Sequence, residues 1–315
     1  MEKAIRTIFM GTPEFAVPPL KSLIDDPNFE IVAVFTNPDE PIGRKQILSA
    51  PPVKRAALEN KLPLYQPLKI RDELETIKNL TPDLIIVVAY GHLIPQSILD
   101  IPKYGCINIH GSLLPKYRGA ACLQAPLLNG DPESGITIMK MEAGLDTGPI
   151  LRQAKIELTA DEDIIGLRTK LSNLSSEILI PTLEDYLAGK IKEQKQDDSL
   201  ASYVKMVKKE DGCLDFTKSA LETERMIRAF KIWPGTWFNL EMPDGEKKKI
   251  QILEAGHDII KGKFAEPGRL FKYDKQLALQ CGQNALLILS LQIEGKNPIS
   301  GTAFLNGYQG LIKSI

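Results

Sequence analysis

Cysteine and histidine, the residues that most often bind zinc, are scarce in this sequence. It contains four cysteines and three histidines among 315 residues, and no two cysteines form a CxxC pair. Because zinc sites need several such ligands at short spacings, we expect a protein that uses no metal. Scattered single cysteines are also typical of the reducing cytosol, so we expect free thiols rather than disulfides.

Long apolar segments are also missing. No stretch reaches the ~18 apolar residues that a membrane-spanning helix needs. The N-terminal segment, MEKAIRTIFMGTPEF, has no long apolar region of the kind found in secretion signals. We therefore expect a cytoplasmic protein with no membrane partner.

The signature motifs of several large enzyme classes are absent as well. The turn after the first strand-like run reads MGTPE, with one glycine and a proline, where dinucleotide-binding enzymes have GxGxxG. The sequence contains neither the GxxxxGK[ST] loop that binds phosphates nor the GxSxG turn of α/β-hydrolases. These absences argue against a dehydrogenase, a P-loop NTPase and a serine hydrolase.

The composition is that of an ordinary folded protein. Hydrophobic residues make up 43% and charged residues 25% of the chain, and this length favours two domains of ~100–200 residues. The formal net charge of −1 is unevenly distributed, because residues 207–315 carry 16 Lys and Arg against 13 Asp and Glu. A nucleic acid would prefer this C-terminal part, although from charge alone scattered surface charge is the better explanation of so small an excess.

Strand-like runs alternate with helix-like segments in the first half of the chain. The runs with the length and apolar content of strands are Ile5–Met10, Ile31–Phe35, Leu84–Ala89, Cys106–Ile109 and Ile136–Met139. This alternation predicts an α/β fold with a doubly wound parallel sheet. Ligands of such sheets bind at the carboxyl ends of the strands, so residues 11–14, 89–94 and 108–118 should lie along one edge.

A polar segment divides the chain into two predicted domains. Residues 1–189 contain the strand–helix alternation and end with a helix within 161–189. Residues 190–206 are mostly polar and are predicted to be a linker. Residues 207–315 contain short strand-like runs separated by glycine-bearing turns, which predicts a small, mainly β domain, such as a barrel. Within it, Ser219 and Glu222 have the spacing of a capping box and predict the start of a helix.

The densest chemical signal is the run NIHGSLLPKYRG at 108–119. Side chains alternate along a strand, so Asn108 and His110 should share one face at the strand end. An amide N–H₂ can donate a hydrogen bond to an oxyanion, and an imidazole can move a proton near neutral pH. The alternative is a polar strand end with a structural histidine.

A second signal is the loop GLDTGP at 144–149, whose two glycines and proline mark a tight turn. An aspartate at this place, Asp146, can orient His110 and favour its protonated form. The alternative is a turn in which the carboxylate only accepts hydrogen bonds from its own backbone.

These motifs together resemble the formyltransferase family that uses 10-formyltetrahydrofolate. The most specific feature is NIHGSLLPKYRG followed by Asp146, 36 residues after His110. Further similar stretches are IFMGTPEFAVPPL at 8–20, PDEPIGR at 38–44, VVAYGHLIP at 87–95, ITIMKMEAGLDTGPIL at 136–151 and IRAFKIWPGTW at 227–237. The resemblance covers nearly the whole chain and is greatest to the members that act on methionyl-tRNA. Lys116-Tyr117 and His92 depart from the residues common there.

The resemblance implies a Rossmann-like catalytic domain and a smaller β-barrel (OB-like) domain that helps to hold tRNA. The expected reaction transfers a formyl group from 10-formyltetrahydrofolate to the α-amine of initiator methionyl-tRNA, for translation initiation, without a metal. The backbone of His92–Ile94 should face the pterin ring. The residue roles that it implies are catalytic for Asn108, His110 and Asp146, folate-binding for Ser112, Leu113, Leu114 and Pro115, and tRNA-binding for Arg44.

Other functions stay open at this point. The same chemistry also allows formyl transfer to a small amine, or hydrolysis of the donor. A folate- or RNA-binding module without catalysis is a further alternative, against which the complete Asn108, His110 and Asp146 set argues.

Overall fold

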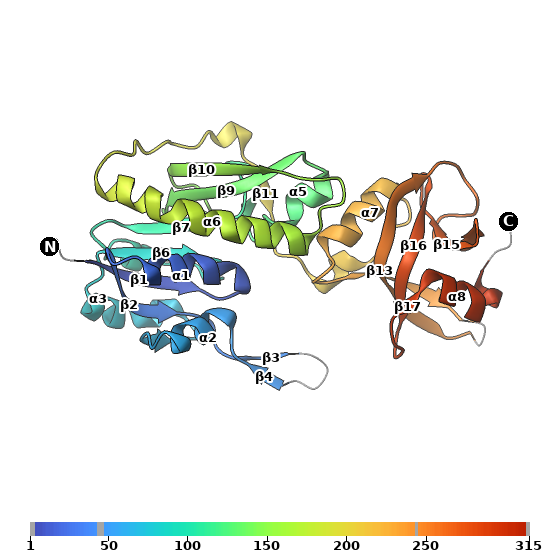
Figure 1. Ribbon diagram of the computed structural model, residues 1–315, viewed down its shortest axis with the longest axis horizontal. Coiled ribbons are helices and arrows are strands. Elements are labelled where there is room, and N and C mark those ends of the chain that lie inside the picture. The colour runs from blue at the N-terminus through green and yellow to red at the C-terminus, as the bar shows by residue number, and fades with distance from the viewer. Residues whose placement is uncertain (1–3, 43–46, 243–244, 313–315) are drawn as a thin grey trace. The chain divides into compact units, whose positions relative to one another are not determined.

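The computed structural model describes residues 4–42, 47–242 and 245–312 of the chain, which form two compact units (Figure 1). The first unit comprises Met1–Cys122, Glu133–Glu157 and Arg168–Lys205, and the second comprises Leu123–Pro132, Leu158–Leu167 and Met206–Ile315. Two short segments from within residues 1–189, the predicted catalytic domain, therefore belong to the second unit. The segment predicted to be a linker belongs to the first unit as far as Lys205.

The first unit contains most of the helices and a large sheet. Its strands are β1 (Ile5–Gly11), β2 (Phe29–Phe35), β3 (Glu40–Ile42), β4 (Ile47–Ser49), β5 (Leu64–Tyr65), β6 (Leu84–Val88), β7 (Cys106–His110), β8 (Arg118–Gly119), β9 (Glu133–Lys140), β10 (Ile150–Glu157) and β11 (Tyr203–Val204). Its helices are η1 (Glu14–Ala16), α1 (Val17–Asp25), α2 (Pro52–Glu59), η2 (Ile70–Glu73), α3 (Leu74–Leu80), α4 (Gln96–Leu99), η3 (Asp198–Leu200) and, from Arg168 onward, α6 (Ile164–Leu187).

The sheet has seven strands in the order β10-β9-β7-β6-β1-β2-β5. β7, β6, β1, β2 and β5 are parallel, and β9 and β10 extend the sheet with antiparallel pairing. The chain proceeds outward in one direction from β1 and later in the other from β6, so a topological switch point lies between these two strands. Gly11 ends β1 there, and a Cβ on it would come within 2.9 Å of the Val88 carbonyl oxygen.

Both faces of the sheet are covered, as its apolar strands predicted. Ile8 and Met10 of β1 pack with Ile77 of α3 and Ile98 of α4. The intervening Phe9 points to the opposite face and is fully buried. Figure 1 shows α1 and α6 lying along the same side of the sheet, and the Ser172 hydroxyl of α6 donates to the Phe15 carbonyl just before α1 (2.8 Å). The predicted doubly wound, Rossmann-like fold is confirmed.

The second unit is a curled antiparallel sheet, a half-barrel, with short helices. The sheet has the order β12-β13-β16-β15-β14, and β17 pairs with β16. Its elements are α5 (Gln124–Asn129), η4 (Lys209–Gly212), α7 (Ala220–Ala229), β12 (Thr236–Glu241), β13 (Lys247–Ile260), β14 (Leu270–Tyr273), β15 (Gln276–Gln280), β16 (Ala285–Ile293), β17 (Ile299–Ser300), α8 (Gly301–Gly307) and η5 (Gln309–Leu311).

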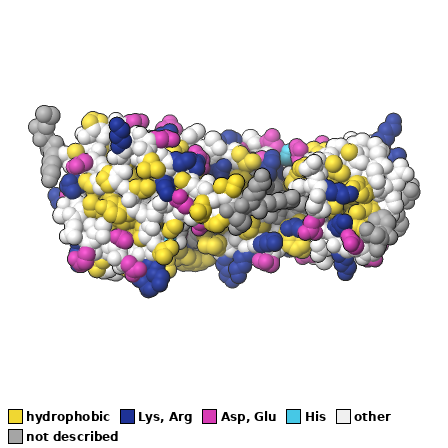
Figure 2. Space-filling view, turned by 90° about the horizontal axis from the view of Figure 1, so that it is seen from below, with side chains coloured by type: hydrophobic (Ala, Val, Ile, Leu, Met, Phe, Trp, Pro, Cys, Tyr) yellow, Lys and Arg dark blue, Asp and Glu magenta, His cyan; other side chains and the backbone are white. Residues whose placement is uncertain are grey.

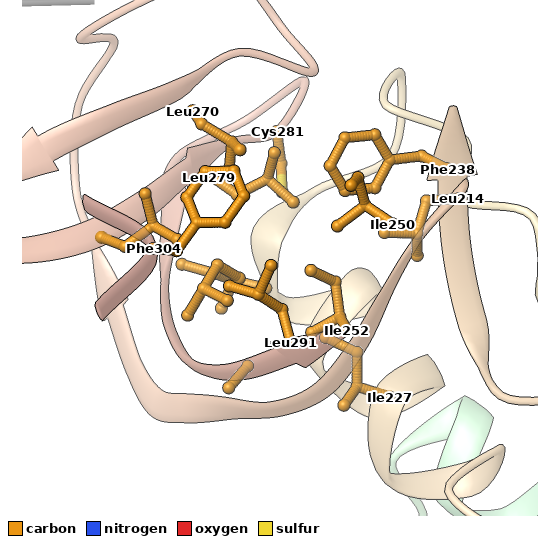
Figure 3. Close-up of a cluster of buried hydrophobic side chains, with 14 of the residues drawn as sticks. Leu214, Ile227, Phe238, Ile250, Ile252, Leu270, Leu279, Cys281, Leu291 and Phe304 are labelled. Atoms are coloured by element: carbon orange, nitrogen blue, oxygen red, sulfur yellow. The ribbon is translucent and has the colours of Figure 1, made fainter. Parts of the chain in front are cut away.

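The concave side of this sheet encloses an apolar core (Figure 3). Leu279 and Leu291 from the sheet, Ile227 from α7 and Phe304 from α8 are all within it. The predicted capping box starts α7, because the Glu222 amide donates to the Ser219 hydroxyl (3.2 Å) and the Ser219 amide donates to the Glu222 carboxylate (2.9 Å). The predicted mainly β second domain is therefore confirmed.

Helix length and polarity bear on membrane insertion. Among the helices that the structure describes, none combines the length and apolar character needed to cross a bilayer.

Candidate active site

Strand β7 brings Asn108 and His110 to the carboxyl edge of the parallel sheet. His110 is buried and Asn108 is half-buried. Among the residues that the structure describes, none forms a hydrogen bond with the Asn108 side chain, so its N–H₂ group is available to a ligand. Both residues therefore lie on the strand and at the sheet edge where the sequence predicted them.

The imidazole of His110 lies between two hydrogen-bond acceptors. Its Nε2 is 2.9 Å from the Tyr117 carbonyl oxygen, and its Nδ1 is 3.7 Å from Oδ2 of Asp146. A carbonyl can only accept, so Nε2 carries a proton, and the carboxylate favours a second proton on Nδ1. Burial lowers the pKa of His110, but the Cys122 thiol, the Asp146 carboxylate and the Tyr117 carbonyl outweigh burial and raise it to about 9. These contacts favour the protonated form of the buried ring.

Asp146 is held by a backbone donor that lies far away in the sequence. Its Oδ2 accepts a hydrogen bond of 2.7 Å from the Gly119 amide, and its own backbone is left-handed, with φ of 53°. The carboxylate thus connects the loop after β9 with the segment after β7. It does not serve as a simple turn residue that binds only its own loop.

A polar network around the buried Thr137 holds the loop that follows His110. The Thr137 hydroxyl donates to the Ser112 carbonyl (2.6 Å) and accepts from the Leu114 amide (3.0 Å). The Gln153 side chain donates to the Leu114 carbonyl (2.8 Å), and the Ser112 hydroxyl donates to the Lys116 carbonyl (2.6 Å). The shape of this loop is therefore set before any ligand binds.

The side chains of the predicted folate-binding loop differ in exposure. Ser112 and Leu114 are buried, and Leu114 packs against Met139 and Ile150. Leu113 and Pro115 are half-buried. A ligand at this loop would meet its backbone, Leu113 and Pro115 first. A bulky residue at Leu114 would disturb the core beneath the loop, so such a change does not isolate a folate contact.

A cavity opens beside the loop that follows β6. It has a volume of about 310 Å³ and is lined by Lys69, Ile70, Arg71, His92 and Leu93. The imidazole Nε2 of His92 lies 2.9 Å from Oδ1 of Asn37. The cavity combines two cations with an apolar wall, and its size is at the lower end of those that hold small molecules.

The segment predicted to be a linker is a built part of this unit. Residues 194–204, here called the strap, begin with a bridge between Gln194 and Ile150 and end with β11, which pairs with β8. Gln196 is buried within the strap and hydrogen-bonds to the fully buried Arg118. Polarity alone suggested a linker, but Gln196, Asp198, Ser202 and Tyr203 of this segment have hydrogen-bond partners elsewhere in the first unit.

Several functional candidates carried no signal in the sequence. Gln196 and Gln153 are single polar residues outside every motif, and Arg118 and Thr137 lie within similar stretches that assign them no role, so only their positions in the fold identify them. Arg44, predicted to bind tRNA, lies outside the described residues. Among the described His, Cys, Asp and Glu residues, no three or more gather in a group that could hold a metal ion.

The parallel sheet with an Asn, a His and an Asp at its carboxyl edge defines a class of protein. The chain matches the family model described as "Formyl transferase" over residues 5–183 and the model "Formyl transferase, C-terminal domain" over residues 206–309. The chain belongs to the formyl transferase family.

Individual relatives in this family carry a more specific name. A protein of Geobacter sulfurreducens named methionyl-tRNA formyltransferase is 46% identical over 308 residues, which cover 97% of this chain and 94% of the relative. A protein of Clostridium novyi with the same name is 38% identical and covers 99% of both chains.

Solved structures share the fold at lower identity. The N-formyltransferase from Helicobacter canadensis, in complex with folinic acid and dTDP-3-aminofucose, has a TM-score of 0.66 and 18% identity, over 90% of this chain and 98% of that one. HypX from Aquifex aeolicus, in complex with tetrahydrofolic acid, has a TM-score of 0.62 and 15% identity, over 99% of this chain and 49% of that one.

Proposed function

We propose that the chain transfers a formyl group from 10-formyltetrahydrofolate to the α-amine of methionyl-tRNA, and so supplies formylmethionyl-tRNA for translation initiation. The observation that carries this proposal is the convergence of Asn108, His110 and Asp146 at one sheet edge. Similarity over nearly the whole chain to relatives named for this activity supports the acceptor. An enzyme that acts on tRNA in this pathway works in the cytoplasm.

The proposed reaction needs an oxyanion donor and a proton carrier. The methionyl amine attacks the formyl carbon, a C–N bond forms, and the carbonyl oxygen becomes an oxyanion. The free N–H₂ of Asn108 and the His110 imidazolium are suited to stabilise that oxyanion. The bond from carbon to folate N10 then breaks as N10 gains a proton and the attacking nitrogen loses one. His110 can give one proton and take the other, which returns it to the imidazolium.

The donor site is proposed to include the backbone of His92–Ile94, the loop Ser112–Pro115 and the cavity beside them. Folate carries a flat pterin, an aromatic spacer and a glutamate with two carboxylates. The cavity places Lys69 and Arg71 next to an apolar wall. Cations suit the glutamate carboxylates, and Leu93 offers apolar contact to the spacer.

The second unit and Arg44 are each proposed to contribute to binding of the acceptor. On the face drawn in Figure 2, Lys and Arg side chains are interspersed with Asp and Glu, so tRNA recognition there would depend on particular residues rather than on a wholly basic surface. One candidate is Lys249, whose ammonium lies 4.3 Å from the centroid of the Trp237 ring. A cation can pair with a phosphate while the neighbouring aromatic ring stacks on a base.

The decisive experiment offers the protein a donor with a labelled formyl group. The acceptors are methionyl-tRNA, free methionine, an amino-sugar nucleotide and water alone. We expect label on methionyl-tRNA and little elsewhere. Label only on a small amine, or release of free formate at the same rate without acceptor, would replace the proposed function with one of the alternatives above.

A further inference from the structure

We propose that Gln196 is a positioning residue for the reaction: from within the strap, its side-chain amide holds the loop that carries Asp146 in place against His110. This inference rests on the proposed function, since Asp146 and His110 have their catalytic roles only there.

The Gln196 amide spans three partners with both of its polar atoms. Its Nε2 donates to the carbonyl oxygens of Asp146 and Gly148, both at 2.8 Å, and its Oε1 accepts from Nε (3.1 Å) and Nη2 (2.9 Å) of Arg118. The orientation of the amide is fixed by chemistry, because a flipped amide would direct N–H₂ at a guanidinium and oxygen at two carbonyls. Gln196 is 5% exposed, so water cannot replace these partners at no cost.

Arg118 anchors the glutamine from the other side. Its guanidinium also donates to the Asp198 carboxylate (2.7 Å) and to the Tyr203 hydroxyl (2.9 Å), both in the strap. The residue is 1% exposed. A buried charge keeps its position only where its hydrogen bonds are made, so Arg118 ties the strap to the loop after β7.

Two of the groups that contact Asp146 and His110 belong to residues bound by the strap. The Gly119 amide that binds the Asp146 carboxylate belongs to β8, which pairs with β11 of the strap. A Cβ on Gly119 would come within 2.3 Å of the Val204 carbonyl, so only glycine allows the strap so close. The Tyr117 amide donates to the Ser202 hydroxyl (2.9 Å), and the carbonyl of the same tyrosine faces His110. Among these strap residues, Gln196 differs because its side chain hydrogen-bonds to the backbone of Asp146 itself.

The test replaces Gln196 by glutamate and compares it with Tyr203→Phe. Gln196→Glu keeps an acceptor for Arg118 but loses both N–H donors and turns a carboxylate oxygen toward two carbonyls. Tyr203→Phe removes one hydrogen bond of Arg118 and leaves the glutamine contacts intact. Thermal unfolding confirms that both variants fold. If Gln196→Glu does not fold, Gln196→Asn takes its place, because the shorter amide cannot span Arg118 and both carbonyls.

Two measurements distinguish a positioning role of Gln196 from a general loss of folded structure. The first is kcat against KM in formyl transfer, and the second is the NMR titration of His110. That signal is assignable because the chain has three histidines and His110→Gln removes one of them. Around the ring, Asp146, the Cys122 thiol and the Tyr117 carbonyl set its titration. If Asp146 moves away from the ring, its carboxylate stabilises the imidazolium less, and the pKa of His110 falls.

We expect Gln196→Glu to lower kcat by ~10-fold or more, with both KM values within ~2-fold, because small misplacements of catalytic groups are costly. The titration midpoint of His110 should shift downward, and Tyr203→Phe, which weakens only the anchor of Arg118 and keeps both N–H donors of Gln196, should change both quantities less than Gln196→Glu does. Unchanged kcat and midpoint in Gln196→Glu, or equal losses in both variants, would overturn the proposal. If the wild-type protein transferred no formyl group to methionyl-tRNA, the proposed function would fail, whereas the titrations would still decide whether Gln196 positions Asp146.

Discussion

The Nδ1 atom of His110 lies 3.7 Å from Oδ2 of Asp146, while the same carboxylate oxygen accepts a 2.7 Å hydrogen bond from the Gly119 amide. The aspartate is thus fixed by the backbone and acts on the imidazole through its charge rather than through a short hydrogen bond. Geometry and charge are separable here, since an amide can replace the carboxylate at the Gly119 contact.

Asp146→Asn should therefore lower kcat with little loss of stability. The asparagine oxygen can still accept from Gly119, so the loop keeps its anchor, but the negative charge beside the imidazolium is gone. We expect kcat to fall by ~10²-fold and the pKa of His110 to fall as well. Steady-state kinetics and an NMR titration measure these two effects. A normal kcat with a lowered His110 pKa would show that protonation of the ring does not limit turnover.

Asn108→Ala tests the oxyanion donor. The amide has no protein partner among the described residues, so its removal leaves no broken hydrogen bond, and stability should be nearly unchanged. Loss of one such donor typically lowers kcat by ~10²–10³-fold, and His110→Ala should cost at least ~10²-fold. The measurement is kcat together with the free energy of unfolding. Near-normal turnover of the His110 variant would refute the mechanism.

The raised pKa of His110 predicts a specific dependence of stability on pH. Its pKa in the folded protein is about 9, above its ordinary value of 6.5. The imidazolium therefore contributes stability that is fully present below pH ~6.5 and is lost as pH rises through ~9, on the order of 3 kcal/mol. Urea unfolding of the wild type and of His110→Gln at pH 6 and pH 10 measures the effect. The advantage of the wild type should shrink at the higher pH, and a constant difference would contradict a raised pKa.

The cavity beside His92 predicts how the donor is bound. Lys69→Ala and Arg71→Ala should each raise KM for 10-formyltetrahydrofolate by ~3–10-fold, because charge-assisted hydrogen bonds contribute about 1 kcal/mol or more. A donor that lacks the glutamate should show no such increase. Lys78→Ala is the matched control, since its ammonium lies 2.8 Å from the Glu75 carboxylate and does not line the cavity. Equal effects with both donors would mean that the two cations do not bind glutamate.

Sequence patterns predicted the fold because each helix or strand repeats its spacing of apolar residues along its length. A continuous apolar run marked β6, mainly apolar runs marked β1 and β7, and the capping box at Ser219 and Glu222 marked the start of α7. The strand-end motif also predicted that Asn108 and His110 lie on one strand, where side-chain alternation alone gives them a common face. Long-range partners such as Gly119 for Asp146 have no such pattern.

The strap shows where pattern-based prediction fails. Its polar composition is typical of an exposed connection, but Gln196 is buried against Arg118, 78 residues away in sequence. This changes how the domains can be separated. A truncation near Ser202 would remove β11 and the Tyr203 contact of Arg118, and it would leave residues 123–132 and 158–167 without the rest of the second unit. Whether residues 207–315 bind tRNA is better tested with point variants.

The loop containing Arg44 is predicted to contact the tRNA acceptor arm. Arg44 itself lies outside the described residues, but the chain that leads to it is anchored: the Asp39 carboxylate accepts from Lys54 at 2.7 and 2.8 Å and from Gln66 at 2.9 Å. A guanidinium can form paired hydrogen bonds with phosphate and stack on a base, which an ammonium does less well. Arg44→Ala should therefore sharply lower kcat/KM with methionyl-tRNA and leave folate binding intact, while Arg44→Lys should restore it only in part.

The salt dependence of kcat/KM for methionyl-tRNA distinguishes a direct contact between Arg44 and tRNA from an indirect effect of the substitution. Fewer matched phosphate charges mean fewer released counterions, so kcat/KM of Arg44→Ala should fall less steeply with salt than that of the wild type. Lys21→Ala, an exposed change on α1 with the same loss of charge, is the matched control and should keep the wild-type slope. The measurement is kcat/KM for methionyl-tRNA across a salt series for the three proteins. Coincident curves for the wild type and Arg44→Ala would mean that the loop does not touch the acceptor, and tRNA recognition would then have to come from the second unit alone.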